Sequence, residues 1–400
     1  MRKIILVFFL FLYTVPGTVL AVGEQTNMAT DKESKNMLES VVQQQEKSLD
    51  MHELEEFILE VDKEMNLYIP DMSFSHLFET MKKGEFDFSP QNAVSGIMNF
   101  FLHEVTSNLA ILGKLIIIAV ACSVLSNLQL SFQGGTVAKL AYFICLLALI
   151  TVALASFNLA VNTGLASIQR MVTFMKLLLP VLLVLLTAMG GLTSASLLQP
   201  FLMVFLNLMG VITQGIIFPL IYLTAIISIA NNISDYFKVS RIATFIKQIT
   251  KVGIGLVLTL FIGVITVEGV AGAVVDGVTL RTAKYMTGAF VPVAGGMFAD
   301  ALDAIMGGSL LLKNAIGLTG VLVLGAIVIF PVLKILAIAV IYRLAAAMLQ
   351  PIGNNLIADT LEDMAGSLFL AFAAVASVAI MFFLTVVIIV GAANFTVMLR

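Results

Sequence analysis

The stretch AIGLTGVLVLGAIVIFPVLKILAIAVIY, residues 315–342, decides the fold, because its only charged side chain is Lys334. A transmembrane helix needs about 20 predominantly apolar residues. The same character continues outward from Thr106 to the C-terminus, and the whole 400-residue chain is 60% hydrophobic and 12% charged. A soluble domain carries about twice that share of charge. The sequence therefore predicts an all-α, polytopic membrane protein.

The apolar runs also predict where the chain crosses the membrane. One run, 197–230, is too long for a single span and short for two, so we expect it to form a hairpin or re-entrant pair that bends near Gln214. This folding back would place the basic loop 231–251 in the cytoplasm, as the excess of Lys and Arg on that side of membranes requires. We expect about eight crossings, with the remaining spans near 106–128, 138–161, 171–190, 252–275, 315–342 and 366–391.

The N-terminus differs sharply from the rest of the chain. Residues 1–21 combine a charged start, an apolar run and a small-residue cleavage site, which predicts a secretory signal peptide. Residues 22–105 then carry a net charge of −11, against +6 for residues 106–400. Apolar side chains recur at spacings of three and four from Met51, which predicts an amphipathic helix. We expect an extracytoplasmic helical segment, which serves either as a small cap or as a docking helix for a partner.

The sequence contains no pattern of catalytic or ligand-binding residues. Cys122 and Cys145 both lie in apolar runs, and the three histidines are more than 20 residues apart. Phosphate-binding, metalloprotease, nucleophile-elbow and dinucleotide motifs are missing from the sequence. We therefore expect no enzyme activity, no cofactor, no metal and no nucleic-acid partner.

Polar side chains at bilayer depth are functional candidates by default. Glu268 is the only acid within a clear span, Lys334 lies in the span quoted above, and Gln214 lies at the expected bend. An ion pair between Glu268 and Lys334 is the structural alternative, and a proton or ion relay is the functional one.

Two stretches 151 residues apart suggest an internal duplication. Residues 180–200 and 331–351 agree at nine of 21 positions, including the prolines that begin and end them: Pro180 with Pro331, and Pro200 with Pro351. Such prolines often interrupt transporter helices. We also expect 276–314, which mixes glycines and charges with apolar residues, to be re-entrant or interfacial.

The basic loop contains Lys238, Arg241, Lys247 and Lys251, interleaved with apolar residues. This pattern is typical of a helix that lies on anionic lipid headgroups. Membrane lipids are therefore an expected partner, and a specific protein site is the alternative.

The chain resembles the stage III sporulation protein AE family in RTAKYMTGAFVPVAGGMFADALDAIMGGSLLLKN (281–314) and QPIGNNLIADTLEDMAG (350–366). The resemblance implies a membrane subunit of the channel or secretion-like complex between mother cell and forespore, needed for late forespore gene expression after engulfment. It implies the other stage III sporulation proteins, AA to AH, and stage II sporulation protein Q as partners, and the mother-cell-derived membrane as location. An independent secondary transporter of a small solute and a non-conducting assembly scaffold remain the alternatives.

Overall fold

The computed structural model describes residues 51–66, 90–131, 136–233, 239–290, 294–352 and 355–398. The expected signal peptide at residues 1–21 and most of the acidic segment lie outside these ranges. All described elements are helices, which confirms the all-α class. In chain order they are α3 (His52–Asn66), α5 (Pro90–Ser107), α6 (Leu109–Ser131), α7 (Thr136–Ala188), α8 (Leu192–Ile212), the π-helical turn η2 (Thr213–Ile217), α9 (Phe218–Ile233), α10 (Ser240–Phe290), α11 (Ala294–Leu349), the 3-10 turn η3 (Gln350–Ile352) and α12 (Asn355–Met398).

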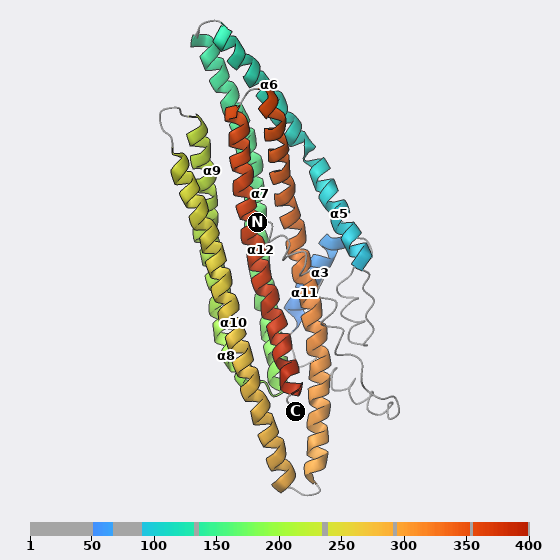
Figure 1. The fold of residues 1–400 in the computed structure, drawn as a ribbon. Coiled ribbons are helices and arrows are strands. Elements are labelled where there is room, and N and C mark those ends of the chain that lie inside the picture. The colour runs from blue at the N-terminus through green and yellow to red at the C-terminus, as the bar shows by residue number, and fades with distance from the viewer. Residues whose placement is uncertain are drawn as a thin grey trace.

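Six stretches of helix are long and apolar enough to cross a membrane, which confirms a multi-pass membrane protein. They are Gly96–Leu125, Leu140–Ala188, Leu192–Asn232, Ser240–Thr279, Met306–Ile352 and Leu356–Ala392. Most are far longer than a bilayer requires. The 53 residues of α7 extend over about 80 Å, against a hydrocarbon core of about 30 Å. The bundle is therefore an elongated rod, as Figure 1 shows.

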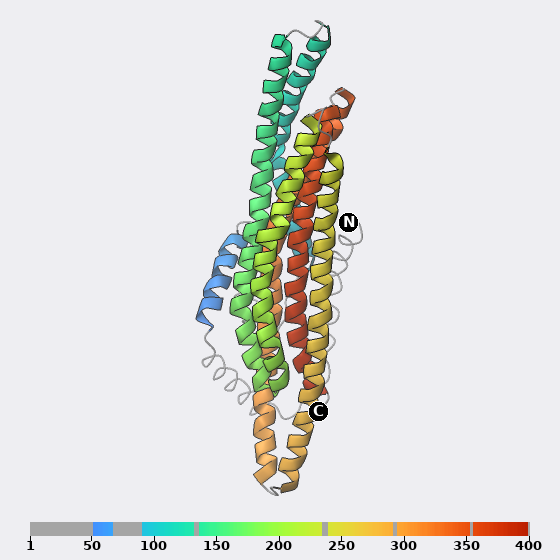
Figure 2. The same ribbon diagram turned by 90° about the vertical axis from the view of Figure 1, so that its left-hand side faces the viewer.

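α12 lies at the centre of this rod, where it packs against α7, α9, α10 and α11. Figures 1 and 2 show it surrounded by these long neighbours. Small residues make this close approach possible, because lipid supplies no hydrophobic driving force and association rests on tight packing. Ala365, Ala371 and Ala374 of α12 are fully or nearly fully buried.

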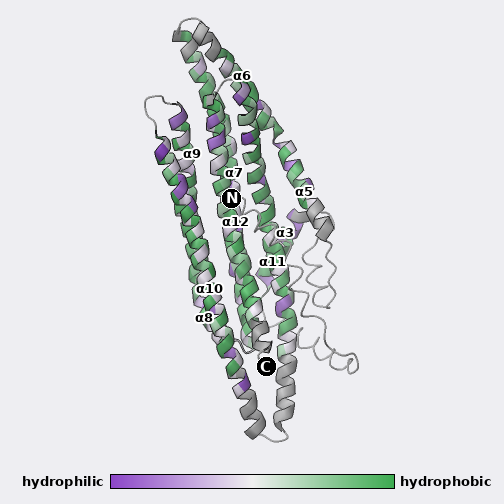
Figure 3. Ribbon diagram, in the orientation of Figure 1, coloured by the Kyte–Doolittle hydropathy of each residue, from purple (hydrophilic) through white to green (hydrophobic). Residues whose placement is uncertain are grey.

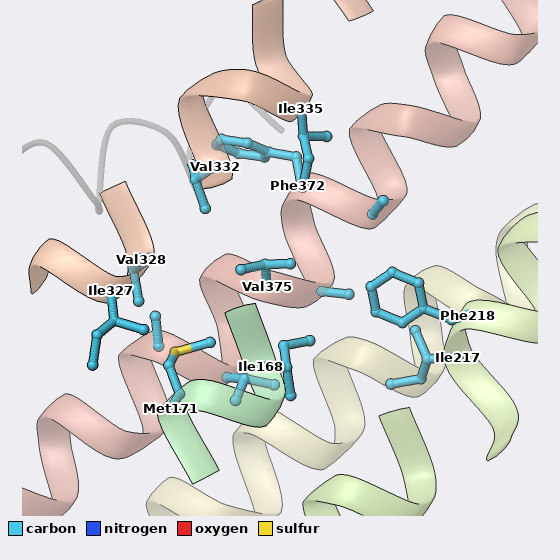
Figure 4. Close-up of a cluster of buried hydrophobic side chains, with 14 of the residues drawn as sticks. Ile168, Met171, Ile217, Phe218, Ile327, Val328, Val332, Ile335, Phe372 and Val375 are labelled. Carbon is cyan, nitrogen blue, oxygen red and sulfur yellow. The ribbon is translucent and has the colours of Figure 1, made fainter. Parts of the chain in front are cut away.

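The core at mid-length joins five elements through branched and aromatic side chains, as Figure 4 shows. A Cβ atom added at Gly164 of α7 would lie 3.1 Å from both Ile335 of α11 and Val375 of α12. The backbone of α7 therefore reaches its neighbours here without an intervening side chain. The cluster in Figure 4 contains Ile168, Met171, Ile217, Phe218, Ile327, Val328, Val332, Ile335, Phe372 and Val375.

The crossings differ from the expected ones at two places. The runs 138–161 and 171–190 belong to one continuous helix, α7, and the hairpin expected over 197–230 is not formed, since α8, η2 and α9 follow one another in one direction. Each difference removes one expected crossing, so the structure has six candidate spans in place of the expected eight. The length rule failed because these helices extend well beyond one bilayer thickness.

The expected bend near Gln214 is a local widening of the helix and not a reversal. At the C-terminal end of the π-turn Thr213–Ile217, the N–H of Phe218 donates to the carbonyl of Thr213, five residues earlier. The next residue is Pro219, which has no N–H to donate and disfavours regular helix geometry before it. The helix absorbs this defect by a π-turn, a known response that leaves the helix continuous.

Three of the four prolines expected to break helices lie inside them. Pro180 lies in α7, Pro200 in α8 and Pro331 in α11, and only Pro351 falls in a turn, η3. In its described parts the stretch 276–314 forms the end of α10 and the start of α11. The two similar stretches also fold differently. Residues 180–200 include the turn between α7 and α8, whereas 331–349 is uninterrupted helix.

The turn between α7 and α8 is fixed by a carboxylate from another helix. Gly190 has φ of 88°, a left-handed conformation that favours glycine. The buried Asp276 of α10 accepts hydrogen bonds from the backbone N–H groups of Thr193 and Ser194, each at 2.8 Å. These N–H groups belong to the first turn of α8 and have no partner within that helix. Asp276 therefore caps α8 in the way a local N-cap residue would, and its negative charge suits the helix dipole.

This capping requires α10 to approach α8 closely, which predicts opposite effects for two glycines of α10. A Cβ atom at Gly272 would lie 2.8 Å from the Cα atom of Ser194, whereas one at Gly263 would meet nothing within 4 Å. We expect Gly263→Ala to stabilise the fold by up to about 1 kcal/mol, through helix propensity alone. Gly272→Ala should destabilise it by about 1–3 kcal/mol through overpacking. Thermal unfolding in detergent, followed by circular dichroism, checks both, and equal shifts for the two variants would contradict this packing.

Candidate functional site

A charged cavity of about 400 Å³ lies between α3, α5, α7 and α11, and it is the candidate functional site. Its charged lining consists of two acids and two bases, each contributed by a different helix. Apolar side chains and Thr163 of α7 complete the wall. The lining residues are Val61, Glu64, Phe100, Glu104, Thr163, Arg170, Ala326, Ile327, Phe330, Pro331 and Lys334.

The first charge pair joins α5 to α11. The Nζ atom of Lys334 lies 3.9 Å from an Oε atom of Glu104, and the Glu104 side chain is only 14% exposed. The same carboxylate oxygen accepts a hydrogen bond from the amide of Asn108 at 3.0 Å. Lys334 is thus paired inside the bundle, as charges within membrane proteins generally are. The aromatic rings of Phe100 and Phe330 meet edge to face beside this pair, with centroids 4.5 Å apart.

The second charge pair joins α3 to α7. Arg170 donates from Nη1 to Glu64 at 2.7 Å, and its Nη2 atom lies 3.9 Å from Glu60. That Nη2 atom is shielded from solvent and has no hydrogen-bond partner within the described residues. One guanidinium therefore holds two acids of α3, and it retains donors that a water molecule or a polar solute in the cavity could use.

The cavity lies beside Pro331, where α11 would otherwise lose a hydrogen bond. Proline has no N–H, so the carbonyl four residues earlier, that of Ile327, has no helical donor. The hydroxyl of Ser167 on α7 donates to this carbonyl at 3.1 Å. A side chain from a neighbouring helix thus satisfies the freed backbone group, which is how transmembrane helices tolerate proline. This contact explains why Pro331 does not break α11.

Apolar contacts hold α3 against α7 and α11. Leu54 and Val61 are buried on the inner face of α3, and the ring of Phe57 lies 5.5 Å from that of Phe174 of α7. A second, mainly apolar pocket of about 270 Å³ lies below the same helix, between α7 and α11. α3 therefore covers two hollows on one side of the bundle. The predicted amphipathic helix is confirmed, and its inner face packs against the spans.

Glu268 and Lys334, which the sequence suggests as an ion pair, lie apart in the structure. Lys334 lines the charged cavity, but Glu268 lies half-buried on α10, and no ion pair of Glu268 occurs in the described part of the chain. α12 lies between the helices that carry them. Gln214 is exposed on η2, where its amide donates to Gln169 at 3.4 Å. The Glu268–Lys334 ion pair, one of the two alternatives, is therefore not formed, and Glu104 is the acid beside Lys334.

The expected interfacial residues lie at the start of α10. Arg241 and Lys251 are exposed, whereas Lys247 forms an ion pair with Asp363 of α12 at 3.6 Å. Lys238 lies outside the described residues. Figure 3 shows hydrophilic residues gathered at this end of α9 and α10. Pro180, Pro200 and Pro351 are exposed and lie outside the charged cavity.

Sequence reasoning missed Glu104, Arg170 and Lys313. Arg170 falls between two runs that were expected to be separate spans, and Glu104 directly precedes the first span. Lys313 is fully buried, and its ammonium donates to the carbonyl of Val390 on α12 at 2.8 Å. It lies in the stretch that was expected not to span. Long apolar helices with an isolated charge at their centre would have been the signal for Arg170.

The charged cavity suits water or a small polar solute. Four charges of balanced sign surround it, and aromatic rings form part of its wall. Within the described residues, no group of three or more His, Cys, Asp and Glu side chains is placed to hold a metal ion. The site thus offers binding and pairing of charges, and the arrangement provides no activated nucleophile.

The contact of Ser167 with the carbonyl freed by Pro331 predicts a coupled pair of substitutions. Ser167→Ala alone should cost about 1–3 kcal/mol, because it leaves that buried carbonyl unpaired. In a Pro331→Ala background the helix regains its own N–H donor, so Ser167→Ala should then cost less than about 0.5 kcal/mol. Unfolding of the wild type, the two single variants and the double variant in detergent gives the coupling energy. Additive changes in the free energy of unfolding would contradict the proposal that Ser167 replaces the N–H donor that Pro331 lacks.

Comparison with known proteins places the chain in a family. The family description "Stage III sporulation protein AE" matches residues 72–393. The stage III sporulation protein AE of Bacillus subtilis (strain 168) is 38% identical over 400 residues, which covers all of both chains. Comparison with the solved structures gave no match. The resemblance stated from the two motifs is confirmed: this multi-pass membrane protein belongs to the stage III sporulation protein AE family.

Proposed function

We propose that this protein is an integral membrane subunit of the channel or secretion-like complex between mother cell and forespore, required for late forespore gene expression after engulfment. Family membership and the six candidate spans support this function. By the same resemblance its partners are the other stage III sporulation proteins, AA to AH, and stage II sporulation protein Q. Its location is the mother-cell-derived membrane around the forespore.

The proposed orientation follows from the signal peptide and the number of crossings. Export of the N-terminal segment means that the chain enters its first span from outside the cytoplasm. An odd number of crossings, three, then separates this segment from the start of α10, so the basic residues face the cytoplasm. This agrees with the positive-inside tendency. Arg241 and Lys251 would contact anionic headgroups there, and the C-terminus would face outside after six crossings.

The observation that carries the proposal is the attachment of α3 to the membrane domain. An acidic helix from the segment expected outside the cytoplasm is bound through Arg170 beside a cavity between the spans. A partner in the space between the two membranes that pulled on this segment would act directly on α7 and α11. Such a link would couple the exported part of a conduit subunit to its spans.

A packed interior argues against a pore through a single chain. The described centre of the bundle is filled by fully buried side chains such as Tyr342, Phe157 and Phe382. Protein interiors of this kind leave few voids larger than a water molecule. A conduit would therefore lie on the outside of the rod, between copies or beside other subunits. A scaffold that conducts nothing remains the third possibility, and the same packing suits it.

One observation favours the alternative, an independent secondary transporter of a small solute. Lys334 lines a cavity with both signs of charge, which could bind a solute. The other residue of that hypothesis, Glu268, lies elsewhere on α10. The two residues proposed for a transport pathway, Glu268 and Lys334, therefore do not line the same cavity.

Deletion of the gene in its own host tests the proposed function. We expect arrest after engulfment with a silent late-forespore reporter, because the conduit would be incomplete. A complementing Arg170→Glu variant should fail like the deletion, since its charge repels Glu60 and Glu64, and adding Glu64→Arg should restore part of the reporter signal. Lys176→Glu, an exposed position on the same helix, is the matched control and should complement. Normal spores from the deletion strain would reject the proposal.

Substitution of Glu268 by Gln separates the conduit from the transporter. The change removes the charge and keeps the shape, so a proton- or ion-coupled carrier that uses this residue should lose its activity. For a conduit subunit we expect spore formation within about twofold of wild type and normal assembly with partners. A reporter that stays silent while the complex assembles would favour the carrier.

A further inference from the structure

The helix α3 is acidic on the side that faces away from the bundle. It contains six acids and one lysine, and all of these side chains except that of Asp62 are exposed. Figures 1 and 2 show α3 on one flank of the rod at mid-height, with α10 on the opposite flank. Whether the exposed acids of α3 face water or lipid therefore depends on how deep in the membrane α3 lies.

Contacts along the bundle relate the level of α3 to residues of α10. α3 covers α11 from Ile316 to Lys334. At one end of this stretch, Gly317 packs against Val390 of α12. At the other end, Ile335 of α11 and Val375 of α12 both pack against Gly164 of α7. The stretch of α12 from 375 to 390 is thus at the level of α3.

α12 in turn packs along α10, and both helices run in the same direction. Asp363 pairs with Lys247 at one height, and Ile388 packs on Gly269 at another. Counting along the two helices from these contacts places residues 375–390 of α12 beside roughly residues 258–271 of α10. Leu260, Val264 and Val267 of α10 are exposed at this level.

The exposed face of α10 is one continuous apolar stripe. Its side chains recur at spacings of three and four from Ile242 to Val278, with Val275 directly beside Val274. The exposed Lys251 marks the headgroup level near its start, because lysines anchor helices at the interface, whereas Lys247 pairs with Asp363 of α12. About 20 further residues cross the hydrocarbon core, which therefore extends to around residue 271. The stripe contains Ile242, Phe245, Ile249, Val252, Leu256, Leu260, Val264, Val267, Val270, Val274, Val275 and Val278.

α3 therefore lies at the same depth as the part of α10 that crosses the hydrocarbon core. Acids such as Glu53 and Glu56 cannot face lipid there, since intramembrane charges face the protein interior or a water-filled space. The ion pairs of Arg170 and Lys334 and the cavity between them lie on this same flank. At this single depth the exposed stripe of α10 is apolar, with the half-buried Glu268 beside it, and the α3 flank is hydrophilic.

We propose that the α3 flank faces water at bilayer depth and lines an aqueous conduit, while the α10 stripe faces lipid. This inference deepens the proposed function and rests on it, because it names the wall of the conduit. α3 is then an inner lining that presents acids to the lumen. The charged cavity behind it is a wet recess, which opens to water from the side of the rod.

Thiol accessibility in membranes of sporulating cells tests this assignment. The full-length chain would carry Cys122→Ala and Cys145→Ser, with single cysteines placed at Glu56 on α3, at Thr163 in the cavity and, as the lipid-facing control at the same level, at Val264. The membranes are opened so that a membrane-impermeant maleimide reaches both surfaces. We expect Glu56→Cys and Thr163→Cys to react at least about tenfold faster than Val264→Cys, because maleimide reacts with a thiolate and thiolates form in water.

Two results would overturn the inference. Unreactive Glu56→Cys would mean that α3 is shielded from water, and fast reaction of Val264→Cys would mean that this whole level lies outside the bilayer. The late-forespore reporter in the gene-deletion strain is a separate readout. A wet α3 flank with normal spores would therefore reject the proposed function alone, whereas a dry flank with arrested spores would reject only the present assignment.

Discussion

The lack of water inside a bilayer is the constraint on which this structure depends. Every backbone N–H and C=O group at that depth needs a partner within the protein. Long uninterrupted helices meet this need, and the defects in them are repaired from neighbouring helices. Ser167 donates to the carbonyl that Pro331 leaves free at this depth, and Asp276, which lies beyond the core near the end of the α10 span, accepts from the first turn of α8. Both repairs tie together helices that are distant in the sequence, so satisfaction of the backbone also sets the packing.

The same constraint shapes the charged flank. Glu104, Arg170 and Lys334 are each paired, and their partners come from different helices. Such pairs are energetically useful chiefly because an unpaired charge there would be costly. The pairs of Arg170 with Glu60 and Glu64 place α3 against the spans, so that this helix packs with the described membrane helices. α3 thereby lies next to α11 at Pro331, across the charged cavity.

Much of the fold was predictable, and the errors have physical causes. Apolar length gave the helical class and the membrane location, and three-and-four spacing gave the amphipathic helix that begins near Met51. The hairpin over 197–230 was wrong because a π-turn before Pro219 let the helix continue. The proline breaks failed for a similar reason, since a hydroxyl from α7 replaces the missing donor at Pro331. The sequence around Pro331 does not reveal this donor, because Ser167 belongs to a different helix.

The sequence by itself determined what could be inside a membrane, because hydropathy is a property of each segment alone. It identified Lys334 as an unusual charge and the family through two motifs. Only the tertiary structure decided which acid faces Lys334, and it selected Glu104 in place of Glu268. It also brought α3 beside Arg170 and so made one flank hydrophilic. Pairing depends on which helices are neighbours, and that choice is made by close packing around α12, which composition and spacing do not encode.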